Sequence, residues 1–372
     1  MSIRQERVSR TPGARFRHVF TREGLSENAV PLLFFILCTF GVALCGKSPQ
    51  FLIQEIITRL GRNTFTVMSL TIPVVAGLGL NFGIVLGAMA GQTGLFIVTH
   101  LKVPGIAGLL SAVAISIPLA VALGLLAASV LNRARGHEMI AGMILGFFMN
   151  GVYQFVYLFL CGTVFPIRNP DLVLPQGFGL RNTVELKYMK YALDNLLAIV
   201  PGGILIPVVT FAVIAATGWA ITALYRTKLG QDFRAVGQNM HIAEVSGINV
   251  DRTRTIALVL STVLASTGHI IFLQNVGTIN TYNSHEQVGM FAIAALLVGG
   301  ATVVKATVGQ AVVGTLLFHL LFIVSPYAGQ RLMGNPQVGE YFRVFVAYAV
   351  IGVVLFLHAL ERARQASAAA RR

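Results

Sequence analysis

The sequence predicts an all-α, polytopic membrane protein with about ten transmembrane helices, some of them short or broken. Of its 372 residues, 55% are hydrophobic and only 11% are charged, whereas a soluble domain carries roughly 25% charged residues. Nine stretches contain no Asp, Glu, Lys or Arg and reach the length of about 17 residues that a bilayer span requires. This composition excludes a soluble enzyme, a disordered scaffold and a nucleic-acid-binding domain.

The charge-free stretches give the predicted helices in chain order. They cover 28–46, 63–101, 103–132, 139–167, 195–225, 255–285, 287–304, 306–330 and 344–360. The stretch 63–101 is too long for one span and contains Gly77-Leu-Gly-Leu-Asn81, so it predicts two helices with a break between them. The segment Phe51–Leu60 ahead of it is amphipathic and is expected to lie along the outer interface.

Glycines recur at every fourth position around this break, at Gly79, Gly83, Gly87 and Gly91. Small residues at this spacing let a neighbouring helix approach closely, and close packing is one interpretation of the stripe. The other interpretation adds that 77–81 is unwound and lines a pathway. Irregular backbone at membrane depth persists only beside protein or water.

Basic residues outnumber acidic ones by 28 to 14, and their distribution predicts the topology. An even number of spans puts both ends on one side, and Lys and Arg concentrate in cytoplasmic segments. We predict a basic cytoplasmic N-terminal tail over 1–27 and a basic cytoplasmic C-terminal tail over 361–372. The transmembrane domain then covers 28–360, with a cytoplasmic loop at 226–254. The net charge of +14 is explained by this topology and predicts no nucleic-acid partner.

One motif matches a nucleotide-binding pattern but does not fit its context. Residues Gly41-Val-Ala-Leu-Cys-Gly46-Lys47-Ser48 have the G-x-x-x-x-G-K-S spacing of a phosphate-binding loop. Gly41 lies inside an apolar predicted helix whose backbone amides are already bonded, and Pro49 follows the motif directly. We expect no ATP site here, and the chain is predicted to be no enzyme and to hold no cofactor.

The remaining chemistry-bearing residues also argue against an enzyme. The three cysteines, at positions 38, 45 and 161, have no metal-ligand spacing, so no metal site is predicted. Each of the 14 acidic residues lies at a predicted helix end, in a loop or in a tail, whereas a proton-driven transporter needs an acidic group within the bilayer. An ion-driven secondary transporter that binds sodium through carbonyl groups stays open as an alternative.

The loop 226–254 is longer than a simple connection requires and contains a predicted short helix. Asn239 is placed to cap this helix at its beginning, and Gly247 follows its end near Ser246. Ile242 and Val245 give the helix an apolar face, as in a segment that docks into a partner's groove.

The same loop resembles the cytoplasmic coupling loop of ABC-importer permeases of the ribose-type sugar, nucleoside and branched-chain amino acid group. The similarity is carried by Arg234-Ala-Val-Gly237-x-Asn239, Ala243 and Ser246-Gly-Ile-Asn-Val250, and by Ala292-Ile-Ala-Ala-Leu-Leu-Val-Gly-Gly300 downstream. Sugar permeases usually carry Asp-Leu-Ser-x-Gly where this chain has Gly79-Leu-Asn81-Phe-Gly83, which resembles the nucleoside branch in part. A monosaccharide is the expected solute, and a nucleoside is the alternative.

The resemblance implies a mechanism and a set of partners. It implies a permease subunit in a bacterial inner membrane that pairs with a second permease copy or a paralogue, and that couples to cytoplasmic ABC ATPase subunits. An extracytoplasmic binding protein would deliver the solute. The residues implied in ATPase coupling are Arg234, Gly237, Asn239, Glu244 and Gly247.

Neutral polar side chains within the predicted helices are candidate pathway residues, because they offer an uncharged polyol hydrogen bonds without a buried charge. The polar candidates are Asn81, Asn150, Gln154, His269 and Gln274, with Gln92 and His319 as further ones. Phe148 and Phe155 are aromatic candidates for stacking on a sugar or a base. The alternative for each polar residue is a helix–helix hydrogen bond.

Overall fold

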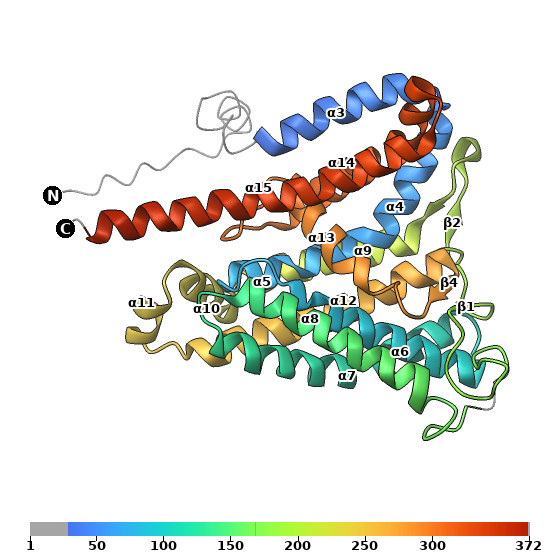
Figure 1. The fold of residues 1–372 in the computed structure, drawn as a ribbon, viewed down its shortest axis with the longest axis horizontal. Helices are drawn as coiled ribbons and strands as arrows, with labels where there is room; N and C mark the ends of the chain where they lie inside the picture. The colour runs from blue at the N-terminus through green and yellow to red at the C-terminus, as the bar shows by residue number, and fades with distance from the viewer. Residues whose placement is uncertain (1–28, 168, 371–372) are drawn as a thin grey trace.

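The computed structural model describes residues 29–167 and 169–370, with the backbone alone for 354–355 and 357–370. It consists of helices and two small two-stranded sheets, and most of the strands lie in the long connection 161–207 between η2 and α9 (Figure 1). Each of the nine charge-free stretches contains a helix, so the all-α, multi-span fold class is confirmed. The predicted tail over 1–27 lies outside the described residues. The predicted tail over 361–372 continues the last helix as far as Ala370.

The first half of the chain forms α3 (Ala29–Cys45), α4 (Pro49–Ser69), α5 (Thr71–Val75), the 3₁₀ turn η1 (Phe82–Ile84), α6 (Val85–Leu101), α7 (Gly105–Arg133), α8 (Glu138–Phe155) and the π-helical turn η2 (Val156–Leu160). The second half forms α9 (Val208–Leu224), α10 (Lys228–Gln238), α11 (Met240–Val245), α12 (Val250–Val276), α13 (Glu286–Val298), α14 (Val308–Met333) and α15 (Pro336–Ala370). Strands β1 (Thr183–Glu185) and β4 (Thr278–Asn280) pair antiparallel, as do β2 (Ala198–Ile199) and β3 (Ile206–Pro207), and the short η3 (Pro201–Gly203) joins the latter two.

Five helical segments of the described chain are long and apolar enough to cross a membrane. They are η1 with α6, α7, α8 with η2, α12 and α14. A sixth span results if α9 and α10, which meet at a bend of 72°, are counted as one. The shorter α3 and α13 are apolar but do not reach full span length, in agreement with the expectation that some helices are short or broken.

The helices pack in two groups with a shared middle (Figure 1). One group contains α6, α7 and α12, and the other contains α3, α14 and α15. Between them, α4 contacts both α12 and α14, and α13 packs on α14. Most of the buried side chains of this arrangement are apolar, and buried amide, imidazole and charged side chains are few enough to be informative.

The expected interfacial helix over Phe51–Leu60 is instead the first half of α4. Ser48 caps this helix, Pro49 occupies its first turn, and the helix continues without a break to Ser69. Its second half is buried in the middle of the molecule, so the polar residues near residue 60 belong to the interior side of the fold.

The predicted break between the second and third helices is confirmed. Between α5 and η1 the backbone is irregular, and Gly77 and Gly79 have φ values of 76° and 68°, which favour glycine. The packing interpretation of the glycine stripe holds for Gly87 and Gly91. A Cβ on either residue would meet the backbone of α12, at Thr262 and Ser266 respectively.

The two ends of the molecule differ in character (Figure 1). The strands β1, β2 and β4 lie at one end, at the right of the view. At the opposite end lie α10, α11 and the C-terminal end of α15. This arrangement places the loop 226–254 and the end of the chain on the same side, as the predicted topology requires.

Candidate functional site

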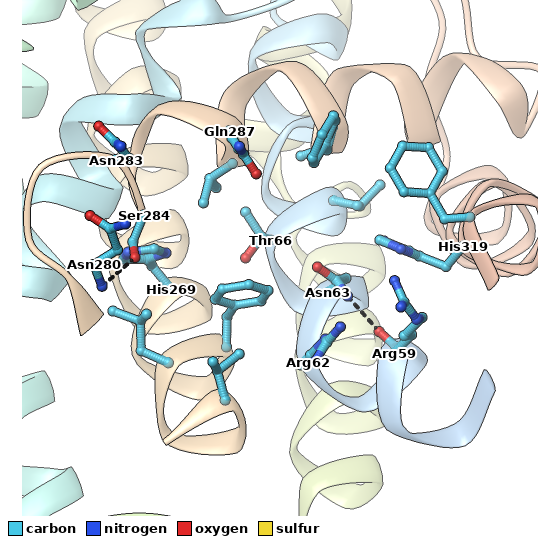
Figure 2. Close-up of a pocket in the computed structure, with 18 of the residues that line it drawn as sticks. Arg59, Arg62, Asn63, Thr66, His269, Asn280, Asn283, Ser284, Gln287 and His319 are labelled. Carbon is cyan, nitrogen blue, oxygen red and sulfur yellow. Dashed lines mark hydrogen bonds between the residues drawn. The ribbon is translucent and has the colours of Figure 1, made fainter. Parts of the chain in front are cut away.

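A cavity of about 400 Å³ lies where α4, α12, α13, α14 and α15 meet (Figure 2). This volume is within the range of about 300–1,000 Å³ that small-molecule sites usually occupy. The cavity begins on α12 at His269, which is 19 residues beyond the start of that helix at Val250. At 1.5 Å per residue, His269 is about 28 Å along the helix axis from Val250, where α12 begins within the loop 226–254. The cavity and the loop are therefore at opposite ends of α12.

One side of the cavity carries amide and hydroxyl groups. Figure 2 shows Asn280, Asn283, Ser284 and Gln287 gathered there, on β4, the following turn and the first turn of α13. Ser284 Oγ accepts a hydrogen bond of 2.9 Å from the Asn280 backbone N–H, which holds the turn in shape. Asn280 Oδ1 is buried without a hydrogen-bond partner among the described residues. Because amides and hydroxyls both donate and accept, this side suits a solute with several hydroxyl groups.

The opposite side of the cavity is cationic. Arg59 and Arg62 line it from α4, and Arg343 lines it from α15. The three aromatic rings of the lining, Phe272, Phe291 and Phe322, lie on three different helices. The Arg62 guanidinium lies 5.5 Å from the centre of the Phe272 ring, and the Arg343 guanidinium lies 4.7 Å from that of Phe322, so both have cation–π contacts.

Two buried histidines also line the cavity. His269 is 0% exposed and both of its ring nitrogens lack a hydrogen-bond partner in the described part of the chain. His319 is 7% exposed, and its Nδ1 is likewise unpartnered among the described residues. Buried polar atoms are usually hydrogen-bonded, so these nitrogens are candidates for contact with a solute.

Of the seven pathway residues predicted from the sequence, all of which the structure describes, His269 alone lines this cavity. Asn81 lies in the break ahead of η1, with both amide atoms buried and unpartnered among the described residues. Phe148 and Phe155 are 65% and 54% exposed on α8, and Gln154 on the same helix is partly buried. The pathway role of these residues stays a prediction.

Asn150 and Gln274 both bond to neighbouring segments. Asn150 Oδ1 lies 2.8 Å from His285 Nε2, and its amide donates to Glu286 at the start of α13. Gln274 donates a hydrogen bond of 3.0 Å to the buried Asp194, which ties α12 to the segment before α9. The Asn150–Glu286 bond joins two helices, as in the helix–helix alternative weighed from the sequence, whereas Gln274 bonds to a non-helical segment.

The two further candidates differ in position. His319 lines the cavity, whereas Gln92 bonds to residues 280 and 281, at the end of the strand β4 that forms part of the cavity wall. The Gln92 amide donates to the carbonyl groups of Asn280 and Thr281, at 3.3 and 3.0 Å. Gln92 therefore positions β4 from α6 without lining the cavity.

At the other end of the molecule, the loop 226–254 forms α10 and α11. The expected short helix is confirmed: the Ile242 backbone N–H donates to Asn239 Oδ1 at 3.0 Å, and α11 ends at Val245, before Gly247 with φ of 83°. Ile242 and Val245 are 62% and 77% exposed. The helix thus presents two adjacent apolar side chains away from the rest of the chain.

Gly237 brings this loop into direct contact with the helix break. A Cβ on Gly237 would overlap the carbonyl of Val75 and lie 3.1 Å from the backbone nitrogen of Gly77. A Cβ on Gly77 would in turn lie 2.8 Å from the Gly237 Cα atom. The two backbones therefore touch, and a movement of α10 bears directly on the segment between α5 and η1.

A buried ion pair fixes the far end of the loop. Arg254 and Glu138 lie 2.8 Å apart with side chains that are 0% and 7% exposed, joining α12 to the first turn of α8. Arg254 also donates to the carbonyl of Leu131 at the end of α7, at 3.4 Å. Three helices thus meet around one guanidinium group beside the loop.

The comparison with known families decides what kind of protein carries these features. Residues 52–358 match the family described as branched-chain amino acid transport system / permease component. The chain belongs to this family. It is therefore a permease of the ABC-transporter type, as the motifs in the loop 226–254 indicated. The match begins within α4 and ends within α15, so it includes both the cavity and the loop.

Individual relatives are similar over parts of the permease or at low identity. An autoinducer 2 import system permease protein of Klebsiella pneumoniae is 36% identical over 106 residues, which is 28% of each chain. A nucleoside ABC transporter permease protein of Lactococcus lactis is 28% identical, over 39% of this chain and 43% of the relative. The ribose import permease protein of Escherichia coli is 24% identical, over 90% of this chain and 94% of its own length. No solved structure matches the permease.

Three of the most similar relatives align with this permease over only part of their own length. The permease covers 28%, 36% and 24% of these three, which are two autoinducer 2 permeases and a xylose permease. These relatives are named for different solutes, autoinducer 2 and xylose. The solute of this permease therefore has to be argued from its own residues.

Sequence reasoning missed the cationic side of the cavity. Arg59 lies in the segment expected to be interfacial, Arg62 directly precedes the charge-free stretch 63–101, and Arg343 directly precedes the last such stretch, so none is a candidate from the sequence. The sequence offers no clear signal for them, because an arginine at the edge of an apolar stretch usually extends to the membrane interface, and only an arginine within a span indicates a functional site. The polar residues 283, 284 and 287 were missed because they flank Glu286, at the boundary between two predicted spans.

Proposed function

We propose that the permease translocates a small polar solute of the monosaccharide class, using ATP that a partner ATPase subunit hydrolyses. Family membership supports a transport role, and the exposed apolar pair Ile242 and Val245 on α11 is the observation that carries the coupling. An amphipathic helix that presents such a pair is suited to a hydrophobic groove on a partner. The cavity at the opposite end of α12 supplies a site for the solute.

In this proposal the ATPase docks on α11, and the loop residues transmit its movement. Asn239 caps the start of α11, and Gly247 follows its end in a conformation that favours glycine. Arg234 donates to the carbonyl of Tyr225 and so braces the bend between α9 and α10. Glu244 is exposed on α11, where it can pair with a basic group on the ATPase.

Gly237 gives this movement a route into the membrane domain. Its backbone contact with Gly77 passes a displacement of α10 to the broken segment that contains Asn81. A broken helix offers two arrangements of its backbone, which is what alternating access requires. We propose that ATP binding moves this segment and so changes access to the pathway.

The remaining partners follow from the same proposal. The permease acts in a bacterial inner membrane with both ends in the cytoplasm, pairs with a second permease copy or a paralogue, and receives its solute from an extracytoplasmic binding protein. The large exposed side chains on α8, including Phe147, Phe148 and Phe155, support contact of this helix with lipid or with the second permease.

Uptake into proteoliposomes tests the proposal. The permease is reconstituted with its ATPase and binding protein, and uptake of radiolabelled ribose and adenosine is measured with and without ATP. ATP-dependent ribose uptake is the expected result, and a preference for adenosine would support the nucleoside alternative. Uptake by the permease alone, driven by a sodium or proton gradient, would overturn the proposal in favour of a secondary transporter.

The role of α11 is tested separately. Ile242→Asp or Glu244→Ala should reduce ATP-dependent uptake and the stimulation of ATPase activity by the permease. The matched control is Glu185→Ala, which removes another exposed glutamate, on β1 at the opposite end of the molecule. Wild-type stimulation in the α11 variants would show that the ATPase binds elsewhere.

A further inference from the structure

The charges around the cavity do not balance. Arg59 lies 3.5 Å from Glu55 one helical turn away, and Arg343 pairs with Glu340 in the same way on α15. No described carboxylate lies within ion-pair distance of Arg62. No described residue that lines the cavity carries a carboxylate. Three guanidinium groups thus face two carboxylates that lie outside the cavity, and one positive charge is left over.

The hydrogen-bond donors on this side are also in excess. The Nε atoms of Arg62 and Arg343 are buried and lack a partner among the described residues. Guanidinium groups only donate, and they are the side chains best suited to bind a carboxylate or a phosphate through two parallel bonds. An uncharged polyol requires no such group, since hydroxyls are satisfied by amides and by other hydroxyls.

The cavity is therefore polar in two different ways. Figure 2 shows Asn280, Asn283 and Ser284 on one side and Arg59 and Arg62 on the other, with Thr66 between them. The first side fits hydroxyl groups, and the second fits a negative charge. A cation held near a membrane's apolar interior is costly, so an arginine without a carboxylate partner is explained by a ligand that supplies one.

We propose that the solute of this cavity is an anionic polyol, a sugar acid or a sugar phosphate, whose carboxylate or phosphate binds Arg62 while its hydroxyls bind the amide side. The assignment rests on the proposed function, because it takes the cavity as part of the transport pathway, and it narrows that function to an anionic member of the monosaccharide class. The phosphate of an anionic lipid headgroup offers the same charge, so the test has to separate the two sources.

Ligand-induced thermal stabilisation of the purified permease tests this inference. The permease is placed in nanodiscs of phosphatidylcholine, and two matched pairs are titrated: D-glucuronate against D-glucose, and ribose 5-phosphate against ribose. The members of each pair differ in one anionic group. At least one anion should bind about tenfold or more tightly than its neutral partner, which is what one charge-assisted hydrogen bond contributes.

Three variants locate the effect. Arg62→Gln should abolish the preference for the anion, and Arg62→Lys should retain part of it because the charge remains. Asn283→Asp places a carboxylate on an exposed position of the lining and should weaken anion binding through repulsion, even if Arg62→Gln does not fold. Arg133→Gln, which removes an exposed arginine at the end of α7, is the matched control and should bind as the wild type does.

Several outcomes overturn the inference. Equal stabilisation by the anion and its neutral partner, or none by either anion, shows that the cavity does not select a charge. Stabilisation by phosphatidylglycerol with no response to the soluble anions assigns Arg62 to lipid binding. The assay contains no ATPase and no ATP, so these results leave the coupling proposal untouched, and a failure of ATP-driven uptake leaves the binding result standing.

Discussion

The contact between Gly237 and Gly77 makes a sharp prediction for Gly237→Ala. The added methyl group would overlap the carbonyl oxygen of Val75, because their distance would be below 3.0 Å, closer than a Cβ atom comes to other heavy atoms in folded proteins. It would also lie 3.1 Å from the backbone nitrogen of Gly77. Both obstacles are backbone atoms, which cannot rotate away as a flexible side chain can. Either α10 or the segment after α5 must therefore shift by several tenths of an ångström.

The size of the effect follows from two opposing terms. Overpacking costs about 1–3 kcal/mol, and backbone obstacles favour the upper end of this range. Alanine gains up to about 1 kcal/mol over glycine within a helix. The expected net destabilisation is about 2 kcal/mol, which lowers the Tm by several degrees.

The matched control is Gly151→Ala on α8, where an added Cβ meets nothing within 4 Å. This variant has the higher helix propensity of alanine without a steric overlap, so its free energy of unfolding should rise by up to about 1 kcal/mol. Thermal unfolding in nanodiscs measures both variants, and ATP-dependent uptake is assayed at a temperature where each is folded. Gly237→Ala should lose uptake, whereas Gly151→Ala should not. A wild-type Tm and wild-type uptake for Gly237→Ala would refute the close contact and the coupling route built on it.

Three further substitutions test other parts of the structure. Arg254→Gln leaves Glu138 buried without its partner and should lower the free energy of unfolding by about 3–5 kcal/mol. By contrast, Arg135→Gln removes an exposed pair and should cost at most about 1 kcal/mol; similar Tm values for the two would contradict the burial of Arg254. Asn239→Ala removes the cap of α11 and should lower the free energy of unfolding by about 1 kcal/mol. Hydrogen exchange should become faster at the backbone amide of Ile242, which the cap protects, and unchanged exchange at this amide would rule out the cap. Asn81→Ala removes a buried amide without described partners, so it should reduce uptake more than Tm, and unchanged uptake would remove this residue from the pathway.

The sequence predicted the features that depend on local composition. Charge-free stretches gave the helices because a bilayer span needs a continuous apolar run, and every such stretch contains a helix. Asn239 and Gly247 marked the limits of α11, since capping is satisfied within one turn of the chain. The break at 77–81 was likewise evident from its glycines.

The candidate site was predicted only in part. His269 was identified because a histidine within an apolar span is conspicuous by itself. By contrast, Asn150 and Gln274 are equally conspicuous but bond to neighbouring segments, and local sequence does not distinguish these two uses of a polar side chain. Arg59 and Arg62 were missed because the continuity of α4 was not apparent from its mixed composition.

By itself, then, the sequence determined that this chain is a helical permease whose loop 226–254 contains a short capped helix, because hydropathy, helix caps and a family motif each depend on neighbouring residues. Only the tertiary structure decided which polar side chains face one another. Arg62 and Arg343 are 281 positions apart and meet at the cavity because α4 and α15 come together in space. The positive charge of Arg62 has no carboxylate partner among the described residues, and only the fold could show this, because the tertiary structure decides which carboxylates lie near each arginine.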